Sequence, residues 1–494
     1  MKKLSFADAP RILSAFEKDH YDLLKEMNAE GWNLWQVCKI PLFYKLIAAT
    51  SGSGERNKGN SSHIAGLLKT LPRTLRYAAK KNRILFLANT ADKLSKNEEG
   101  IYYNSIIDPI LDLKVLPDPV LIEQPSPQGF LMPARYPWHI NRQVLYYYAA
   151  LKQKCHPRKI TVNTEMTTRL SGLVNDFFLR NGYIDEIKPG FIADVLALFL
   201  REKQFFFSFF KKRLPPFVLG SECMGSGIMA AALELNIPFI ELQHGSIDQH
   251  YPPYIWDRRF LEASRIMKPT QLWVFGTLAK EIILATGFFK EKEIIPVGYK
   301  KIDDMRAKAE DALDKKELSN QLLVVIQPMM HEFNKALITH LLSLKTAGAK
   351  ILFKAHPLQP VAELSEYEAM MQGRGIRIVD KSENIHQLIR SSDLVVGYVT
   401  TCLEEALTLG KPSITITTPE LPAGLHSMTG IDHLKDVIKM VPMEQMGPEI
   451  ARFYDDPVYR QAWQEQVQYK KNDIYNVGYG KNIATAIALL HQKG

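Results

Sequence analysis

The chain of 494 residues has no long hydrophobic run and only four cysteines. A transmembrane helix needs about 18 or more apolar residues in a row, and no such stretch occurs. The basic start MKKLSFADAPRILSAF lacks the apolar centre of a secretory signal, because Asp8, Pro10 and Arg11 interrupt it. The cysteines lack the spacing of metal ligands, which suits a reducing compartment: Cys38, Cys155, Cys223 and Cys402. We therefore expect a cytoplasmic globular protein.

Several signatures of known chemistry are also missing. The stretch GSECMGSG approaches a phosphate-binding P-loop, but Gly227 follows Ser226 where a lysine and a serine or threonine would be needed. No Gly-x-Ser-x-Gly turn occurs, so a serine-hydrolase triad has no support. Helix-turn-helix, zinc-finger and RNA-recognition patterns are absent as well. We therefore expect neither ATP hydrolysis, nor serine hydrolysis, nor nucleic-acid binding.

What the sequence has in excess is positive charge. Lysine and arginine number 62 against 53 aspartates and glutamates, which gives a formal net charge of +9. Such a balance favours acidic partners, namely nucleotide phosphates, a polyanionic glycan or an anionic membrane surface.

The length favours two or three domains, and three segments differ in their pattern. Residues 1–82 place apolar side chains at helical spacing, which predicts a helical N-terminal extension. Residues 83–265 contain a clear strand–helix–strand unit, PPFVLGSECMGSGIMAAALELNIPFIELQHG. Residues 266–494 continue the alternation of short apolar strands and helices. The pattern predicts an α/β protein with two Rossmann-like domains and a joint near residues 265 to 320.

Polar residues follow several of the predicted strands. His244 follows a strand of the first domain, while Gln327, Lys354 and His356 follow strands of the second. Ligands bind beyond the carboxyl ends of parallel strands, so two such domains would bring these residues to one cleft. His244 is therefore a candidate for chemistry; the alternative is a structural histidine in a loop.

The stretch YVTTCLEEALTLGKP predicts the start of a helix. Thr400 and Thr401 lie at its N-terminus, where free backbone N–H groups and the helix dipole attract phosphate. Glu405, one turn further on, could accept both hydroxyls of a ribose. The alternative is an N-cap threonine followed by an exposed first-turn glutamate. In FKAHP, Lys354 and His356 could bind a diphosphate, unless the proline merely ends the strand and the histidine is a loop residue.

Three motifs follow one another along the chain: Gln243-His244-Gly245, Lys354-x-His356-Pro357 and Thr401-x-x-x-Glu405-Ala406-x-x-x-Gly410-x-Pro412. They resemble the motifs of GT-B-fold bacterial glycosyltransferases that make capsules, O-antigens and related surface polysaccharides. That group includes polysialyltransferases, Kdo transferases and the CDP-glycerol polymerases of teichoic acid. The stretch through QHG and the later VGYKKID also resemble UDP-N-acetylglucosamine 2-epimerases, which share the fold. The resemblance covers about residues 83 to 485.

The resemblance implies two domains facing a central cleft, with an acceptor side and a donor side. His356 would hold the donor phosphate, Thr400 and Thr401 would support it, and Glu405 would bind the ribose. The other residues expected on the donor side are Lys354, Pro357, Gln327 and Gly298. Gln243 and Gly245 would lie toward the acceptor, and His244 near the transferred sugar.

The identity of the general base stays open between three residues: His244, Glu222 and Asp248. The acidic-acidic-Gly motif of polysialyltransferases has no counterpart here, and Gln243 stands where teichoic acid polymerases have tryptophan. Glu222 lies at the end of the strand before His244, and its alternative is a polar loop residue.

The reaction implied by the resemblance is glycosyl transfer from a nucleotide-activated donor, with CMP- or CDP-linked sugars as the best candidates. A base would take a proton from an acceptor hydroxyl, which attacks the anomeric carbon. Positive groups would meet the charge of the leaving phosphate. A retaining enzyme would instead use a carboxylate nucleophile. Asp-x-Asp, the metal-binding feature of the other large glycosyltransferase fold, is absent, so we expect no metal and no cofactor.

Two other functions remain open at this point. One is a nucleotide-sugar 2-epimerase, an isomerase that needs no acceptor. The other is a non-catalytic GT-B-like protein that binds glycan.

Basic and aromatic stretches suggest that the protein binds the membrane surface where a lipid-linked acceptor would lie. The aromatic segment from Trp32 to Leu46 and the basic segment from Arg73 to Arg83 could form a peripheral foot on the inner face of the bacterial membrane. The alternative for the aromatic segment is a place in a core. FFFSFFKKR, residues 205–213, offers a similar mixture, although phenylalanines in a core with a solvated basic end explain it better.

Overall fold

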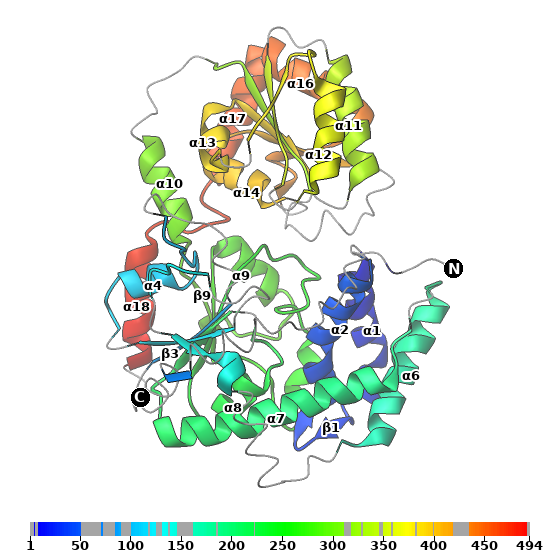
Figure 1. Cartoon of the computed structure of the whole chain (residues 1–494), viewed down its shortest axis with the longest axis vertical. Helices are drawn as coiled ribbons and strands as arrows, with labels where there is room; N and C mark the ends of the chain where they lie inside the picture. Colours follow the sequence, from blue (N-terminus) through cyan, green and yellow to red (C-terminus); the bar gives the residue numbers. More distant parts are fainter. Residues whose placement is uncertain are drawn as a thin grey trace.

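The computed structural model describes residues 4, 8–50, 71–72, 84–89, 100–116, 119–124, 131–136, 139–145, 162–183, 186–221, 223–310, 318–327, 330–344, 349–356, 359–380, 383–398, 400–417 and 434–491. They form two α/β domains, which lie one above the other in Figure 1.

The first domain contains a sheet of seven strands, with the order β5-β4-β3-β6-β7-β8-β9. All six pairings are parallel. Its strands are short and mostly apolar, as expected for a sheet covered on both faces. They are β3 (Leu85–Asn89), β4 (Val120–Gln124), β5 (His139–Asn141), β6 (Val218–Gly220), β7 (Phe239–Leu242), β8 (Gln271–Val274) and β9 (Ile294–Pro296).

The second domain contains a sheet of six strands, with the order β12-β11-β10-β13-β14-β15, and its five pairings are also parallel. The strands are β10 (Gln321–Val325), β11 (Lys350–Lys354), β12 (Ile376–Ile378), β13 (Leu394–Gly397), β14 (Ser413–Thr417) and β15 (Ile438–Pro442). Two parallel sheets with flanking helices confirm the predicted fold class, a two-domain α/β architecture.

Helices cover both sheets (Figure 1). Those of the first domain are α1 (Asp8–Leu24), α2 (Leu34–Thr50), α4 (Asp108–Asp112), α6 (Thr164–Arg180), α7 (Pro189–Arg213), α8 (Gly227–Glu234) and α9 (Thr277–Leu284). Those of the second are α11 (His331–Ser343), α12 (Val361–Met371), α13 (Ile385–Ser391), α14 (Thr401–Thr408), α16 (Met443–Asp455) and α17 (Pro457–Lys470). A small hairpin of β1 (Asn28–Ala29) and β2 (Trp32–Asn33) joins α1 to α2.

The domain boundary lies later than the predicted position between residues 265 and 266, toward the end of the predicted range of 265 to 320. β8 and β9 extend the first sheet, because Ile240 is paired with Gln271 and Leu272 with Ile294. The first sheet ends at β9 and the second begins at β10, so the joint lies between residues 296 and 321. A short buried parallel strand has the same apolar pattern in either domain, which is why the sequence misplaced the joint.

The end of the chain returns to the first domain. Helix α18 (Tyr479–His491) buries Tyr479, Ile483 and Ile487 in an apolar cluster that also contains Phe86 and Trp273 of the first sheet. Before it, the backbone N–H of Asn476 donates to the carbonyl of Phe275. Helix α10 (Lys300–Glu310), which is part of the joint, lies against α18 (Figure 1). Residues assigned to the second domain by the sequence therefore complete the first.

The N-terminal helices are part of the first domain's core and not a separate extension. Trp32, Trp35 and Phe43 of the expected membrane foot are at most 3% exposed and pack in the main apolar cluster. The prediction that this aromatic segment contacts a membrane is therefore wrong. Residues 73–83, its basic counterpart, lie outside the described part of the chain. Within the described residues, no helix is both long and apolar enough to cross a bilayer.

The aromatic side chains in the phenylalanine-rich segment of α7 are also mostly buried. Phe206, Phe209 and Phe210 are buried in the core, while Lys211 and Lys212 at the helix end are exposed. The interpretation as core aromatics with a solvated basic end is confirmed.

A buried ion pair fixes the N-terminal helices to the sheet domain. The Lys39 ammonium lies 2.5 Å from the Glu17 carboxylate, and it donates to the carbonyl of Ile255 at 2.6 Å. Both side chains are nearly inaccessible to solvent. We predict that Lys39→Met costs about 3–5 kcal/mol of unfolding free energy, because it leaves the Glu17 charge buried without its partner. Urea unfolding followed by circular dichroism measures this loss.

Two variants control for this experiment. The double change Glu17→Gln with Lys39→Met should recover part of the loss, since no lone charge remains. Lys25→Met removes an exposed lysine that pairs with Asp22 at 2.8 Å, and it should leave the unfolding curve unchanged. A Lys39→Met protein as stable as Lys25→Met would contradict the structural role of the buried pair.

Candidate functional site

The loop after β7 carries the stretch QHGSID and is held by the side chain of Gln243. The Gln243 amide nitrogen donates to the carbonyl of Gly245 at 2.7 Å, and its amide oxygen accepts from the backbone N–H of Phe275 at 2.7 Å. Gln243 is buried, whereas His244 and Gly245 are half-buried. Both residues predicted to touch the acceptor thus hold the loop in shape, and His244 lies between them.

Asp248 lies further along the same loop and is buried. One of its carboxylate oxygens accepts from the backbone N–H of His250 at 2.6 Å. The loop is anchored again at Tyr254, whose hydroxyl donates to the carbonyl of Leu242 at 3.2 Å. Of the three candidate bases, His244 and Asp248 therefore share a fixed loop. Glu222 lies outside the described residues.

On the second domain, α14 begins where the sequence predicted. Thr400 is the N-cap, its hydroxyl accepting from the backbone N–H of Cys402 at 3.2 Å. Thr401 is the first helical residue and is exposed. Leu403, Ala406 and Leu407 are fully buried, which fixes the helix on its sheet. The first turn thus offers backbone donors and a positive dipole end to an anion.

One hydrogen bond joins the two domains at this place. The Ser246 hydroxyl lies 2.9 Å from a carboxylate oxygen of Glu404, so the QHGS loop meets the first turn of α14. Burial raises the pKa of Glu404 to about 8. Hydrogen bonds from Ser246 and Tyr475 work against this rise, whereas the negative charges of Glu405 and Asp248 add to it. Glu404 is therefore largely protonated at neutral pH.

The neighbouring residue Glu405 has the opposite character. One oxygen lies 3.0 Å from the His386 ring and the other 3.9 Å from the Lys301 ammonium. Burial by itself would raise the pKa of Glu405, but the hydrogen bond with His386 and the charge of Lys301 outweigh it and lower the pKa. Two adjacent carboxyl groups thus differ in charge at neutral pH, an arrangement typical of acid–base sites.

The end of β11 and the residues after it lie at the carboxyl edge of the second sheet, where α14 also begins. The Lys354 ammonium donates to the carbonyls of Asp380 at 2.5 Å and Glu383 at 3.0 Å, which ties β11 to the segment after β12. This contact gives Lys354 a structural role that its motif did not indicate. His356 is half-buried, and burial lowers its pKa, so its ring is neutral at pH 7. Pro357 lies outside the described residues.

Two further residues of the predicted donor side, Gln327 and Gly298, have structural roles. The backbone of Gln327 accepts from the Asn334 amide and donates to the Tyr398 hydroxyl, at 3.1 and 3.2 Å. Gly298 has a φ of +87°, and a Cβ there would lie 2.5 Å from the carbonyl oxygen of Asn476. Gly298 therefore allows the returning C-terminal segment to approach β9, so its glycine is explained without a ligand.

Four residues of this site were not selected from the sequence: Ser246, Lys301, Glu404 and His386. The sequence contained only weak signals for them. The double glutamate was visible, but adjacent helix positions point about 100° apart, and the pattern alone did not tell which faces the other domain. Lys301 comes from a helix far away in sequence, and His386 belongs to the helix before α14, with strand β13 between them.

Comparisons with known proteins found no matching family model and no matching curated protein. Solved structures do resemble the chain. MurG from Acinetobacter baumannii is 11% identical, with a TM-score of 0.46, over 82% of this chain and 99% of that one. The UDP-GlcNAc 2-epimerase from Neisseria meningitidis bound to UDP-GlcNAc is 12% identical, with a TM-score of 0.42, over 83% and 100%.

The wall teichoic acid polymerase TagF, studied with CDPG, is a third similar structure. It is 11% identical, with a TM-score of 0.42, over 87% of this chain and 96% of that one. Likeness at this level concerns the arrangement of two α/β domains and does not distinguish a transferase from an epimerase.

The protonation of Glu404 makes a testable prediction. The ordinary pKa is 4.5, so between pH 4.5 and about 8 the unfolded chain loses a proton that folded Glu404 keeps. Wild-type stability should therefore fall as pH rises through this window, by up to about 1.4 kcal/mol per pH unit from this group, and level off above it. Glu404→Gln should remove that slope. Urea unfolding of both proteins from pH 5 to 9 gives the difference.

Glu405→Gln is the matched control. The folded pKa of Glu405 is lowered, so its carboxylate is ionised in both states above pH 5 and contributes no slope there. A pH-dependent difference of equal size in both variants would show that Glu404 is not held in its neutral form.

Proposed function

We propose that this protein is a glycosyltransferase that moves a sugar from a nucleotide-activated donor to a glycan acceptor. The observation that carries the proposal is the contact between the QHGS loop of one domain and the first turn of α14 in the other. It unites the first and third motifs of the resemblance at one place, although more than 150 residues separate them in the sequence. The similar structures with UDP-GlcNAc or CDPG are in keeping with a nucleotide-sugar partner.

The donor side of the proposal is the N-terminus of α14. Its first turn would receive the nucleotide phosphate, with exposed Thr401 and half-buried His356 as polar partners. The Lys301 ammonium, held near Glu405, adds positive charge for the leaving phosphate. Glu405 remains the candidate for the ribose, because its ionised carboxylate accepts hydrogen bonds from hydroxyls.

The reacting side is the QHGS loop. His244 would take the proton of the acceptor hydroxyl as it attacks the anomeric carbon, and Asp248 is the second candidate for this role. Protonated Glu404 can donate a hydrogen bond toward the departing group, a role that a neutral carboxyl can fill. The proposal requires no metal ion or cofactor, since backbone donors and Lys301 meet the phosphate charge.

The acceptor is proposed to be a cell-surface polysaccharide or a lipid-linked glycan of bacterial type. This finer assignment rests on the motif resemblance alone.

We predict that cytidine nucleotides bind best, because the Lys-x-His-Pro motif is most similar to that of enzymes that use CMP-sugars or CDP-polyols. Thermal shift with CMP, CDP, UDP and GDP tests this directly. Stabilisation by UDP or GDP with none by CMP or CDP would exclude the cytidine assignment. Incubating the enzyme with its nucleotide-sugar alone then separates the alternatives, since an epimerase would change the donor without an acceptor.

Two histidine variants should separate binding from chemistry. His356→Ala is expected to weaken nucleotide binding several-fold, because it removes a partner of the donor phosphate. His244→Ala is expected to keep the nucleotide affinity and lower kcat by at least a hundredfold, since general-base catalysis contributes about that much. Calorimetry with the preferred nucleotide and turnover measurements give both values. Equal losses of nucleotide affinity in the two variants would show that this division of roles is wrong.

A further inference from the structure

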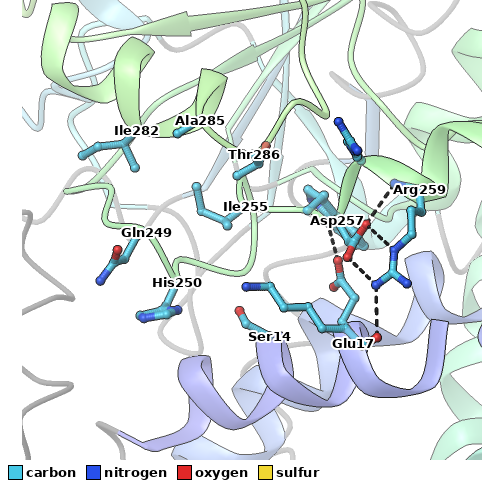
Figure 2. Close-up of a pocket in the computed structure, with 13 residues that line it drawn as sticks. Ser14, Glu17, Gln249, His250, Ile255, Asp257, Arg259, Ile282, Ala285 and Thr286 are labelled. Atoms are coloured by element: carbon cyan, nitrogen blue, oxygen red, sulfur yellow. Dashed lines mark hydrogen bonds and ion pairs between the residues drawn. The ribbon is translucent and has the colours of Figure 1, made fainter.

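A cavity of about 480 Å³ lies in the first domain beside the QHGS loop. Figure 2 shows its walls, which come from α1, from the continuation of the loop, and from α9. The residues that define its chemistry are Ser14, Lys18, His250, Ile255, Arg258 and Ile282.

The cavity has a mainly apolar side, where Thr286 is the polar exception, and a polar side opposite it. Ile255, Ile282 and Ala285 lie together on one side in Figure 2, and Ser14 and Glu17 of α1 lie opposite them. A sugar ring has the same two-sided character, with apolar C–H faces and hydroxyl groups around its edge. The polar and charged side chains of the lining could bind such hydroxyl groups.

Its acidic side chains are already neutralised by partners. Glu17 is paired with Lys39 and accepts from the indole of Trp35. Asp257 accepts two hydrogen bonds from the Arg259 guanidinium, at 3.0 and 2.7 Å. Neither carboxylate therefore leaves negative charge for a cationic ligand.

Two cations of the lining remain in excess. Lys18 and Arg258 are exposed, and neither forms an ion pair with another residue of the described chain. With the two carboxylates matched by Lys39 and Arg259, the cavity carries a surplus of two positive charges. This surplus selects a ligand with a negative group.

The cavity adjoins the proposed reacting centre. His250, on its wall, donates its backbone N–H to Asp248, and Ser246 of the same loop touches Glu404 of the second domain. A glycan that fills the cavity would therefore lie against the loop that also carries the QHGS residues. The nucleotide is assigned to the other domain, so this space is left for the acceptor.

We propose that this cavity binds a negatively charged sugar unit of the acceptor glycan. Its carboxylate or phosphate would lie against Lys18 and Arg258, and the apolar face of its ring against Ile255 and Ile282. That this glycan is the acceptor rests on the proposed function. The site itself requires only an anionic sugar.

The test compares charged and neutral probes of equal length. Tetragalacturonate and maltotetraose form one pair, and glucose 6-phosphate and glucose form the other, each titrated into the full-length protein by calorimetry at low salt. We expect at least one charged probe to bind tenfold or more tightly than its neutral partner, and less tightly as salt rises. The pair with the larger ratio tells whether a carboxylate or a phosphate is preferred.

The double variant Lys18→Gln with Arg258→Gln should lose this preference, with at least tenfold weaker binding of the charged probe. Its matched control is Lys211→Gln with Lys212→Gln, which removes two exposed cations at the end of α7 and should bind as the wild type does. Arg258→Lys alone should keep most of the affinity.

Three results would overturn the proposal. They are the absence of binding by either charged probe, equal binding of charged and neutral probes, and equal losses in the two double variants. Nucleotide binding, measured in parallel, should be the same in all of these proteins. If no nucleotide binds while the charged probe does, the proposed function fails and the anionic-sugar site stands.

Discussion

The parallel direction of every strand pairing in the two large sheets is the constraint on which the site depends. In a parallel sheet the carboxyl ends of the strands gather at one edge, and the loops after them lie together. Ser246 follows β7 of one sheet, and Glu404 belongs to the helix after β13 of the other. Their 2.9 Å contact means that the two carboxyl edges face each other. Helix α18 supports this arrangement by packing the last residues of the chain on the first domain.

The same contact explains how two adjacent glutamates come to differ. Glu404 points to a hydroxyl and lies near two other carboxylates, so burial leaves its proton in place. Glu405 points to a histidine and a lysine, which favour its ionised form. Neither environment is local, since Ser246, His386 and Lys301 come from three different parts of the chain. The acid–base character of α14 is therefore a property of domain packing.

The N-terminal helices show how composition can mislead. Their tryptophans and phenylalanines resembled a membrane-binding surface, yet they form core beside the first sheet. The buried Glu17–Lys39 pair then fixes α1 against the loop that contains Ile255. As a result, α1 supplies one wall of the cavity in Figure 2. A helix of the expected N-terminal extension thus helps to shape the proposed acceptor site.

Apolar periodicity and helix capping act over a few residues. For that reason the fold class, the strands nearest the site and the helix start at Thr400 could be predicted from local pattern alone. Local pattern also pointed to the QHG loop, since polar residues after a buried strand lie at a carboxyl edge. The domain joint, the structural use of Lys354 and Gly298, and the pairing of Ser246 with Glu404 became visible only in the folded chain. Those features depend on which strands become neighbours and on which side chains, distant in sequence, come into contact. Local sequence pattern does not specify either of these.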